Sequence, residues 1–148
     1  MKAKLASIAA LFALSACASV GAPGASADFD PSRCYERQFS IYFEQQEAEL
    51  NAAAREAIRT VQDELRGCQI DSVRVLGLAG AAGTSADNLD LSARRALFIE
   101  QYMEREASWR GKIETLAAGE AGAVAPDGTP EPMRRVARVT VQASAPAN

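Results

Sequence analysis

Segments with the periodicity of strands alternate with segments with the periodicity of helices over residues 38–142, and this alternation limits the folds open to the chain. The strand-like segments are rich in β-branched and aromatic residues that alternate between two faces, as Phe39, Ile41 and Phe43 do. These segments are residues 38–43, 70–78, 112–116 and 134–142. With two helices between them, the order is β-α-β-α-β(-β). That order predicts an α/β sandwich with both helices packed on one face of a small mixed sheet.

Two segments have the three- and four-residue spacing of apolar side chains that marks an amphipathic helix. The first helix is expected to begin after Asn51, a favourable N-cap, and to stop at Gly67. Its apolar positions are Ala54, Ala57, Ile58, Val61 and Leu65. The second helix is expected to begin near residues 88–90 and to continue through Tyr102. Its buried stripe is Ala96, Ile99 and Met103.

The first 16 residues have the pattern of a secretory signal, in which two lysines precede an apolar run over residues 6–14. That run is too short to span a bilayer as a mature helix. It ends in Leu14-Ser15-Ala16-Cys17, which resembles the lipobox of bacterial lipoproteins. The resemblance implies removal of residues 1–16 and acylation of Cys17, which anchors a mature chain to a membrane. The alternative is an ordinary signal peptide in which Cys17 is incidental.

Residues 17–37 are expected to connect the lipidated cysteine to the domain, and residues 143–148 to form a disordered tail. Residues 18–30 are small, almost uncharged and contain Gly and Pro, which predicts a flexible tether with a root-mean-square reach of about 20 Å. Ala18 after the lipidated cysteine implies sorting to the outer membrane. The domain is therefore expected in the periplasm, anchored close to the outer membrane by lipid.

Charge and composition exclude several functions. The net charge is −3, and without Lys2 and Lys4 of the signal the remaining 14 basic and 19 acidic residues give −5. That sign argues against a nucleic-acid partner. The chain has no histidine, which excludes histidine-based acid–base catalysis and histidine-ligated zinc. Neighbouring carboxylates such as Glu47 and Glu49 have no second carboxylate placed opposite them, so we expect no catalytic residue, metal or cofactor.

Two cysteines, Cys34 and Cys68, remain once Cys17 is assigned to lipid, in a compartment that permits disulfides. Each lies shortly before a strand-like segment. Because two parallel strands begin at the same edge of a sheet, we expect the two thiols to meet and form a disulfide. Such a bridge contributes a few kcal/mol in the chain-entropy model. The alternative is a pair of buried free thiols.

A motif at the start of the second helix, Asn88-Leu89-Asp90-Leu91-Ser92-Ala93-Arg94-Arg95-Ala96, resembles the N-x-x-L-S-x-R-R-A of the OmpA-like C-terminal domain family. This family includes peptidoglycan-associated lipoproteins. Weaker similarities lie in residues 41–44, 73–77, 119–120 and 134–136. The resemblance covers roughly residues 39–141, and it implies the OmpA-like α/β fold and noncovalent binding of peptidoglycan.

The resemblance also implies a ligand and the residues that bind it. In this family an Asp in the loop motif G-[HY]-T-D-x-x-G and the second Arg of L-S-x-R-R-A bind the diaminopimelate of the stem peptide. A zwitterionic ligand needs an anion for its ammonium group and a guanidinium for its carboxylate. Arg95 matches the arginine, but the loop over residues 77–83 has Gly80 where the family has Asp. The glycines of this loop also lack the G-x-G-x-x-G spacing of a nucleotide site.

The candidate ligand-binding residues are therefore Arg95, Asn88 and Asp87. In one interpretation Asp87 replaces the missing loop carboxylate; in another, Arg95 only pairs with Asp90 or Asp87 as a structural contact. Two functions follow. The first is an outer-membrane lipoprotein that contacts peptidoglycan through a degenerate site and links the membrane to the cell wall. The alternative is a structural or interaction lipoprotein of the envelope that binds other envelope proteins and no longer binds peptidoglycan.

Overall fold

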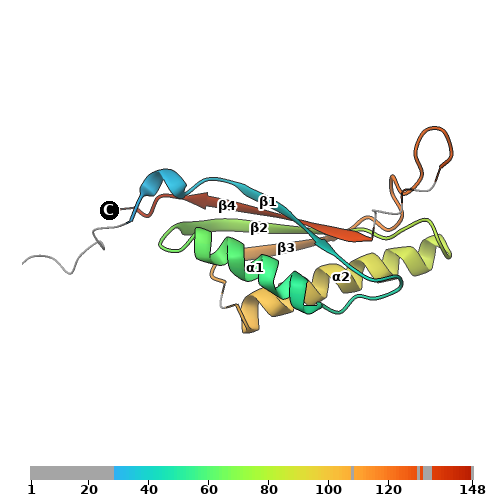
Figure 1. Ribbon diagram of the computed structural model, residues 1–148, viewed down its shortest axis with the longest axis horizontal. Coiled ribbons are helices and arrows are strands. Elements are labelled where there is room, and N and C mark those ends of the chain that lie inside the picture. Colours follow the sequence, from blue (N-terminus) through green and yellow to red (C-terminus); the bar gives the residue numbers. More distant parts are fainter. Residues whose placement is uncertain (1–28, 108, 130, 132–134, 148) are drawn as a thin grey trace, which may run out of the picture.

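The computed structural model describes residues 29–107, 109–129, 131 and 135–147. Figure 1 shows one sheet whose strands run along the long axis of the molecule, with both α-helices on the same face. The elements are η1 (Pro31–Arg33), β1 (Arg37–Tyr42), α1 (Ala52–Glu64), β2 (Gln69–Gly77), α2 (Ser85–Arg105), β3 (Lys112–Ala117) and β4 (Val136–Ser144). The α/β sandwich predicted from the alternation of strand and helix patterns is confirmed.

The last strand in the sequence, β4, lies in the interior of the sheet, whose order is β1-β4-β2-β3. It pairs antiparallel with β1 on one side and with β2 on the other, whereas β2 and β3 pair in parallel. The sheet is therefore mixed, as predicted. β1 and β2 run in the same direction, but β4 separates them.

Alternate side chains of the two central strands point toward the helices and form the core. Four valines there are at most 1% exposed: Val73, Val75, Val139 and Val141. They belong to one apolar cluster with side chains from both helices, among them Ile58, Ile99 and Met103. Removal of this aliphatic surface from water is the main favourable contribution to folding, and it fixes both helices on the sheet.

Gly77, the last residue of β2, allows α2 to pack directly on the sheet. A Cβ atom on Gly77 would overlap the carbonyl oxygen of Ser92, so any other residue would have to displace α2. The hydroxyl of Ser92 donates to the carbonyl of Leu89 at 2.8 Å and accepts from the backbone N–H of Gly119 at 2.9 Å. These contacts set the position of α2 against the end of β2 and the loop that follows β3.

Both helices begin at a polar capping residue. Asn51 caps α1 through its side chain, as predicted. The second helix begins at Ser85, earlier than the predicted start near residues 88–90. The reason is that Thr84 caps it: its hydroxyl accepts from the backbone N–H of Asp87 at 3.1 Å and donates to the Asp87 carboxylate at 2.7 Å.

The ordered domain extends beyond the predicted residues 38–142 at both ends. At its N-terminal end, η1 and the first residue of β1 fall within residues 17–37, which were predicted to be a tether. At its C-terminal end, β4 continues to Ser144, which pairs with Gln69 of β2. The first two residues of the predicted disordered tail therefore belong to the sheet, because β2 offers them a strand to pair with.

Residues 1–16 and Cys17 lie outside the described residues, so the secretory signal and the lipidation site stay predictions. The same holds for residues 18–28 of the predicted tether. Within the described part of the chain, neither α1 nor α2 is both long and apolar enough to cross a membrane.

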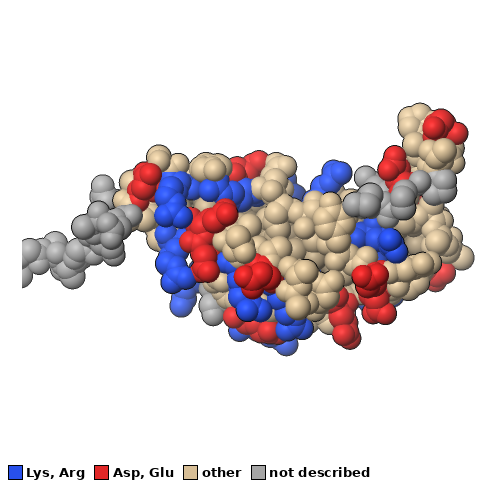
Figure 2. Space-filling view, viewed as in Figure 1, with Lys and Arg blue, Asp and Glu red and all other residues tan. Residues whose placement is uncertain are grey.

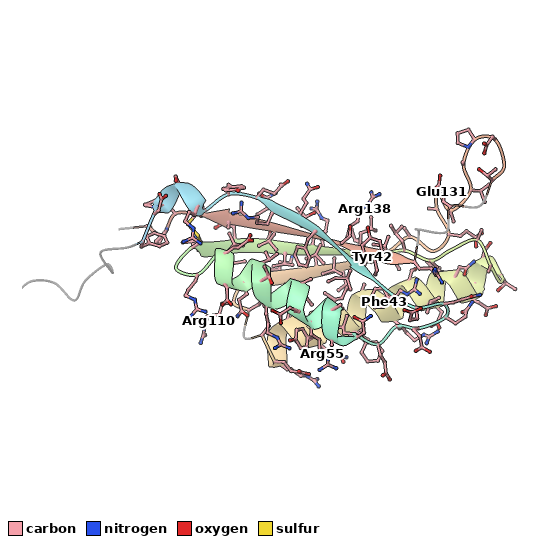
Figure 3. All side chains as sticks on the ribbon, viewed as in Figure 1. Tyr42, Phe43, Arg55, Arg110, Glu131 and Arg138 are labelled. Atoms are coloured by element: carbon pink, nitrogen blue, oxygen red, sulfur yellow. A yellow bond between two sulfur atoms is a disulfide. The ribbon has the colours of Figure 1, made fainter. Side chains whose placement is uncertain are left out.

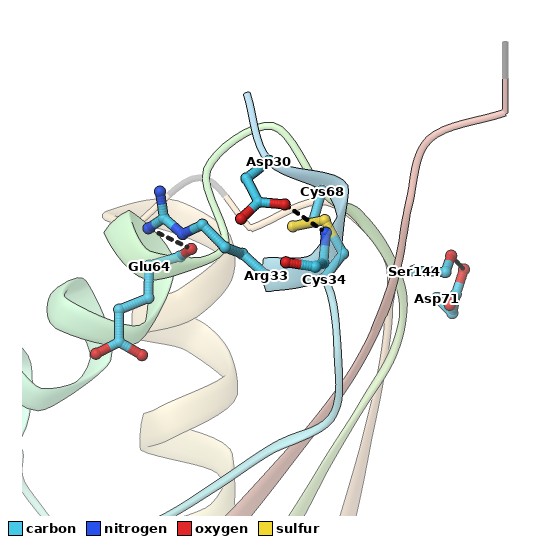
Figure 4. Close-up of a disulfide and its surroundings, with 8 residues drawn as sticks. Asp30, Arg33, Cys34, Glu64, Cys68, Asp71 and Ser144 are labelled. Carbon is cyan, nitrogen blue, oxygen red and sulfur yellow. Dashed lines mark hydrogen bonds between the residues drawn. A yellow bond between two sulfur atoms is a disulfide. The ribbon is translucent and has the colours of Figure 1, made fainter. Parts of the chain in front are cut away.

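Cys34 and Cys68 form the disulfide that was predicted, with their Cα atoms 5.5 Å apart. Figure 4 shows the bridge beside η1, at the end of the sheet where β1 and β2 begin. Next to it, the guanidinium of Arg33 donates to the main-chain carbonyl of Glu64 at 3.2 Å. The bridge thus joins the segment that enters β1 to the start of β2, although the two strands are not neighbours in the sheet.

Candidate functional site

A pocket of about 440 Å³ lies at the end of the molecule opposite the disulfide. It forms where the loops after β1 and β2 meet the N-terminal half of α2 and the start of β4. Its walls are Gln45, Gln46, Gly80, Ala81, Ala82, Asn88, Leu91, Arg95, Glu131 and Arg135. Two of the three predicted ligand-binding residues, Arg95 and Asn88, are brought together here, whereas Asp87 does not line the pocket.

Arg95 lines the pocket although it is 0% exposed. Its guanidinium donates to three main-chain carbonyl oxygens: from Nε to Glu47 at 2.8 Å, from Nη1 to Leu78 at 2.8 Å and from Nη2 to Glu44 at 3.1 Å. The ring centroid of Phe43 lies 4.8 Å from the guanidinium carbon. Arg95 is therefore held in place by the loops after β1 and β2.

No described carboxylate forms an ion pair with Arg95. The interpretation in which it pairs with Asp90 or Asp87 is wrong, because Asp90 accepts from Arg94 at 2.9 Å and Asp87 accepts from the hydroxyl of Thr84. Burial first, and then the like charges of Arg135 and Arg94, lower the pKa of Arg95 to about 10. At neutral pH the group stays protonated. A buried cation without an anion is costly, and this pocket is therefore suited to an anionic ligand group.

Asn88 is 2% exposed and directs its side chain toward Glu120 in the loop after β3. Its Nδ2 donates to Oε2 of Glu120 at 2.6 Å, and the hydroxyl of Ser85 donates to Oε1 at 2.5 Å. These hydrogen bonds, that from Ser85 first, hold the pKa of Glu120 below its ordinary value. Asn88 thus joins the N-terminal turn of α2 to the loop after β3 beside the pocket.

The loop after β2 contributes Gly80, Ala81 and Ala82 to the wall, and none of them carries a charge. Gly80, which the sequence resemblance aligns with the family's Asp, therefore lies in the pocket wall. A Cβ atom on Gly80 would have one neighbour within 4 Å outside the adjoining residues, the Cγ of Arg135 at 4.0 Å. Gly80 also does not have the positive φ that favours glycine. The site therefore has room for a side chain here.

Four wall residues were missed by the sequence reasoning: Gln45, Gln46, Glu131 and Arg135. Gln46 is the one described non-glycine residue with a positive φ, 62°. That conformation costs about 1–2 kcal/mol, and such strain is found most often at functional sites. Glu131 belongs to a loop rich in Gly, Pro and Ala whose sequence has no periodicity, so no signal placed it at the site.

The wall chemistry is that of a noncovalent binding site for a small charged group. It combines two guanidinium groups, three side-chain amides and one carboxylate around small apolar residues. These groups bind ions through charge and hydrogen bonds. Within the described residues, no three His, Cys, Asp or Glu side chains lie together as metal ligands would.

Residues 42–137 match the model of the OmpA family. Over 101 residues the chain is 29% identical to the peptidoglycan-binding protein ArfA of Mycobacterium tuberculosis, a match that covers 68% of this chain and 31% of ArfA. Over 101 residues it is 25% identical to outer membrane protein A of Bordetella avium, which covers 68% of this chain and 52% of that protein. The chain thus spans about a third to a half of the length of these two relatives.

Two solved structures share the fold. The OmpA-like domain of FopA1 from Francisella tularensis superposes with a TM-score of 0.57 at 20% identity, over 76% of this chain and 77% of that domain. The peptidoglycan-associated lipoprotein from Burkholderia pseudomallei superposes with a TM-score of 0.51 at 18% identity, over 71% of this chain and 89% of that protein. At these identities the likeness concerns the fold alone.

Proposed function

The chain belongs to the OmpA family, and we propose that its domain binds peptidoglycan noncovalently through the pocket around Arg95. The observation that carries this proposal is the buried guanidinium of Arg95, which contacts three carbonyl oxygens but no anion. A carboxylate of the stem peptide would provide the missing charge and accept the remaining N–H donors. The mycobacterial relative is a peptidoglycan-binding protein, which supports the same ligand here.

The proposal includes a lipid anchor at Cys17, with the protein on the periplasmic side of the outer membrane. The chain enters the domain beside the disulfide, and the pocket lies at the opposite end of the long axis (Figure 1). An anchored domain of this shape would direct its pocket away from the lipid. It would thereby link the outer membrane to the cell wall.

The uncharged loop at Gly80 favours a second candidate function. Removal of one partner of a desolvated charge pair costs about 2–5 kcal/mol, which is roughly 30- to several-thousand-fold in affinity. A pocket with an affinity lowered by that amount would no longer hold the domain on peptidoglycan. The second candidate is therefore an interaction lipoprotein of the envelope that has lost peptidoglycan binding and contacts other envelope proteins.

Co-sedimentation with isolated peptidoglycan sacculi tests the proposal on the full-length protein in mild detergent. We expect the wild type to sediment with the sacculi and Arg95→Lys to lose most of this binding, because lysine lacks the planar fork of donors. Arg94→Ala is the matched control, because Arg94 is the neighbour of Arg95 in the sequence but pairs with Asp90 at the surface. Circular dichroism of Arg95→Lys separates loss of binding from loss of fold.

Gly80→Asp provides a second arm, because the added side chain has room and faces the pocket. We expect it to strengthen sedimentation of a protein that already binds. If the wild type stays in the supernatant and Gly80→Asp sediments, the pocket has lost wall binding, and the result favours the interaction lipoprotein. If neither sediments, the pocket does not serve wall binding.

A further inference from the structure

One acidic side chain, that of Glu131, lines the pocket. It comes from the loop between β3 and β4, which Figure 3 shows at the pocket end of the molecule. The backbone N–H of Glu131 donates to the carbonyl of Ala123 at 2.7 Å, and the N–H of Ala123 donates to the carbonyl of Glu120 at 2.8 Å. Ala123 is itself 1% exposed. The main chain at Glu131 is therefore fastened to a buried residue of the same loop.

The charges that line the pocket are not paired with one another. Within the described residues, neither the carboxylate of Glu131 nor the guanidinium of Arg135 forms an ion pair. The guanidinium of Arg95 donates its hydrogen bonds to main-chain carbonyl oxygens. Cations and an anion thus line one pocket of about 440 Å³ without contact. A ligand that carries both an ammonium and a carboxylate group would neutralise both kinds of charge at once.

We infer that Glu131 receives the ammonium group of the ligand whose carboxylate is bound by Arg95. This inference rests on the proposed function. It assigns binding of the ammonium group to the loop after β3, because the loop after β2 has no charged residue in the pocket wall. Asp87 is not a substitute, because its carboxylate accepts from the hydroxyl of Thr84 and Asp87 does not line the pocket. The ligand class is therefore a zwitterionic amino-acid head group, such as the free end of diaminopimelate in a stem peptide.

A cycle of protein and ligand changes tests the assignment in calorimetric titrations of the full-length protein in detergent. The probes are a stem tripeptide that ends in diaminopimelate, its derivative with the free amino group acetylated and its derivative with the adjacent carboxyl group amidated. We expect Glu131→Gln to weaken binding of the unmodified tripeptide on the order of tenfold. Glu131→Gln should not weaken binding of the acetylated probe, because that probe has no ammonium group to lose. It should weaken binding of the amidated probe by the same factor as binding of the unmodified tripeptide, because that probe keeps its ammonium group.

Glu114→Gln is the matched control, because this exposed glutamate pairs with Arg74 on β2 and does not line the pocket. Gly80→Asp added to Glu131→Gln should restore affinity, since it returns a carboxylate to the pocket wall. Equal binding by the wild type and Glu131→Gln would overturn the inference and leave the proposed function standing. An equal loss on all three probes would also overturn it, because Glu131 would then act through the loop. If the wild type binds none of the three probes, the role of Glu131 and the proposed function are both wrong.

Discussion

The two ends of the long axis use their charged residues differently. Beside the disulfide, Arg37 pairs with Glu64 at 3.2 Å, and on the face shown in Figure 2 positive and negative side chains are mixed over this half. At the pocket end, the buried cation of Arg95 has no anionic partner, and Gln46 has a strained backbone. The first end has a disulfide and an ion pair, although the buried Nη1 of Arg37 has no hydrogen-bond partner there, whereas the second end has a buried cation with no described anion beside it.

This difference separates the sources of stability from the sources of binding. A cross-link stabilises the whole domain wherever it lies, because it restricts the unfolded chain. An unpaired buried charge and a left-handed backbone lower stability, and proteins retain such features mainly where they serve function. We therefore expect loss of the disulfide to lower the free energy of unfolding without altering binding, and changes at the pocket end to alter binding and to raise stability where they relieve strain.

The largest expected effect is that of removing the disulfide by the double change Cys34→Ala and Cys68→Ala. It should lower the free energy of unfolding by about 3–4 kcal/mol, measured by urea denaturation, because the unfolded chain gains conformational freedom. The affinity for the stem tripeptide should not change. Wild type treated with a thiol reductant is the control and should behave like the double variant. A severalfold change in affinity would show that the two ends are coupled.

A smaller effect of opposite sign is expected for Gln46→Gly. Glycine adopts the φ of 62° at this position without strain, which offsets its greater freedom in the unfolded chain. The free energy of unfolding should rise by up to about 1 kcal/mol. Gln45→Gly is the matched control, and it should lower stability because residue 45 has no positive φ. A loss of stability in both variants would mean that Gln46 is not strained.

The smallest expected effect is the loss of stability at acid pH from one carboxyl group at each end, Asp30 and Glu120. Hydrogen bonds from Ser32 hold the pKa of Asp30 below 3.8, and those from Ser85 and Asn88 hold that of Glu120 below 4.5. Both groups therefore add stability above these values, and the contribution is lost as the pH falls through the lowered pKa. Carboxyl carbon NMR should show that Ser85→Ala raises the pKa of Glu120 alone, and that Ser32→Ala raises that of Asp30 alone. If either variant changed the pKa of both groups, the two ends would not be independent.

Most of the fold was predictable because periodicity and capping are local properties. Asn51 and the apolar spacing after it placed α1 correctly. The start of α2 was misplaced because its first turn is polar and lacks the apolar spacing of a helix, although Thr84 caps it there. The last residues of β4 carry no strand pattern of their own, and they belong to the sheet only because β2 pairs with them.

The site was only partly predictable. The family motif placed Arg95 and Asn88, but the partners of Arg95 are main-chain carbonyl groups, which no side-chain pattern reveals. Glu131 lines the pocket because its stretch of the loop between β3 and β4 is hydrogen-bonded to the buried residue Ala123. Tertiary contacts of this kind leave no trace in the spacing of residues along the chain.

The position of the disulfide determines how the domain responds to mechanical force. β1 is an edge strand paired with β4 alone, so a single ladder of hydrogen bonds would otherwise resist a pull on the chain ahead of Cys34. The bridge passes that tension to Cys68, directly before β2. β2 has a partner strand on each side, and both ladders must shear together before it moves. A load from the N-terminal side therefore acts first on a central strand of the sheet and not on an edge strand.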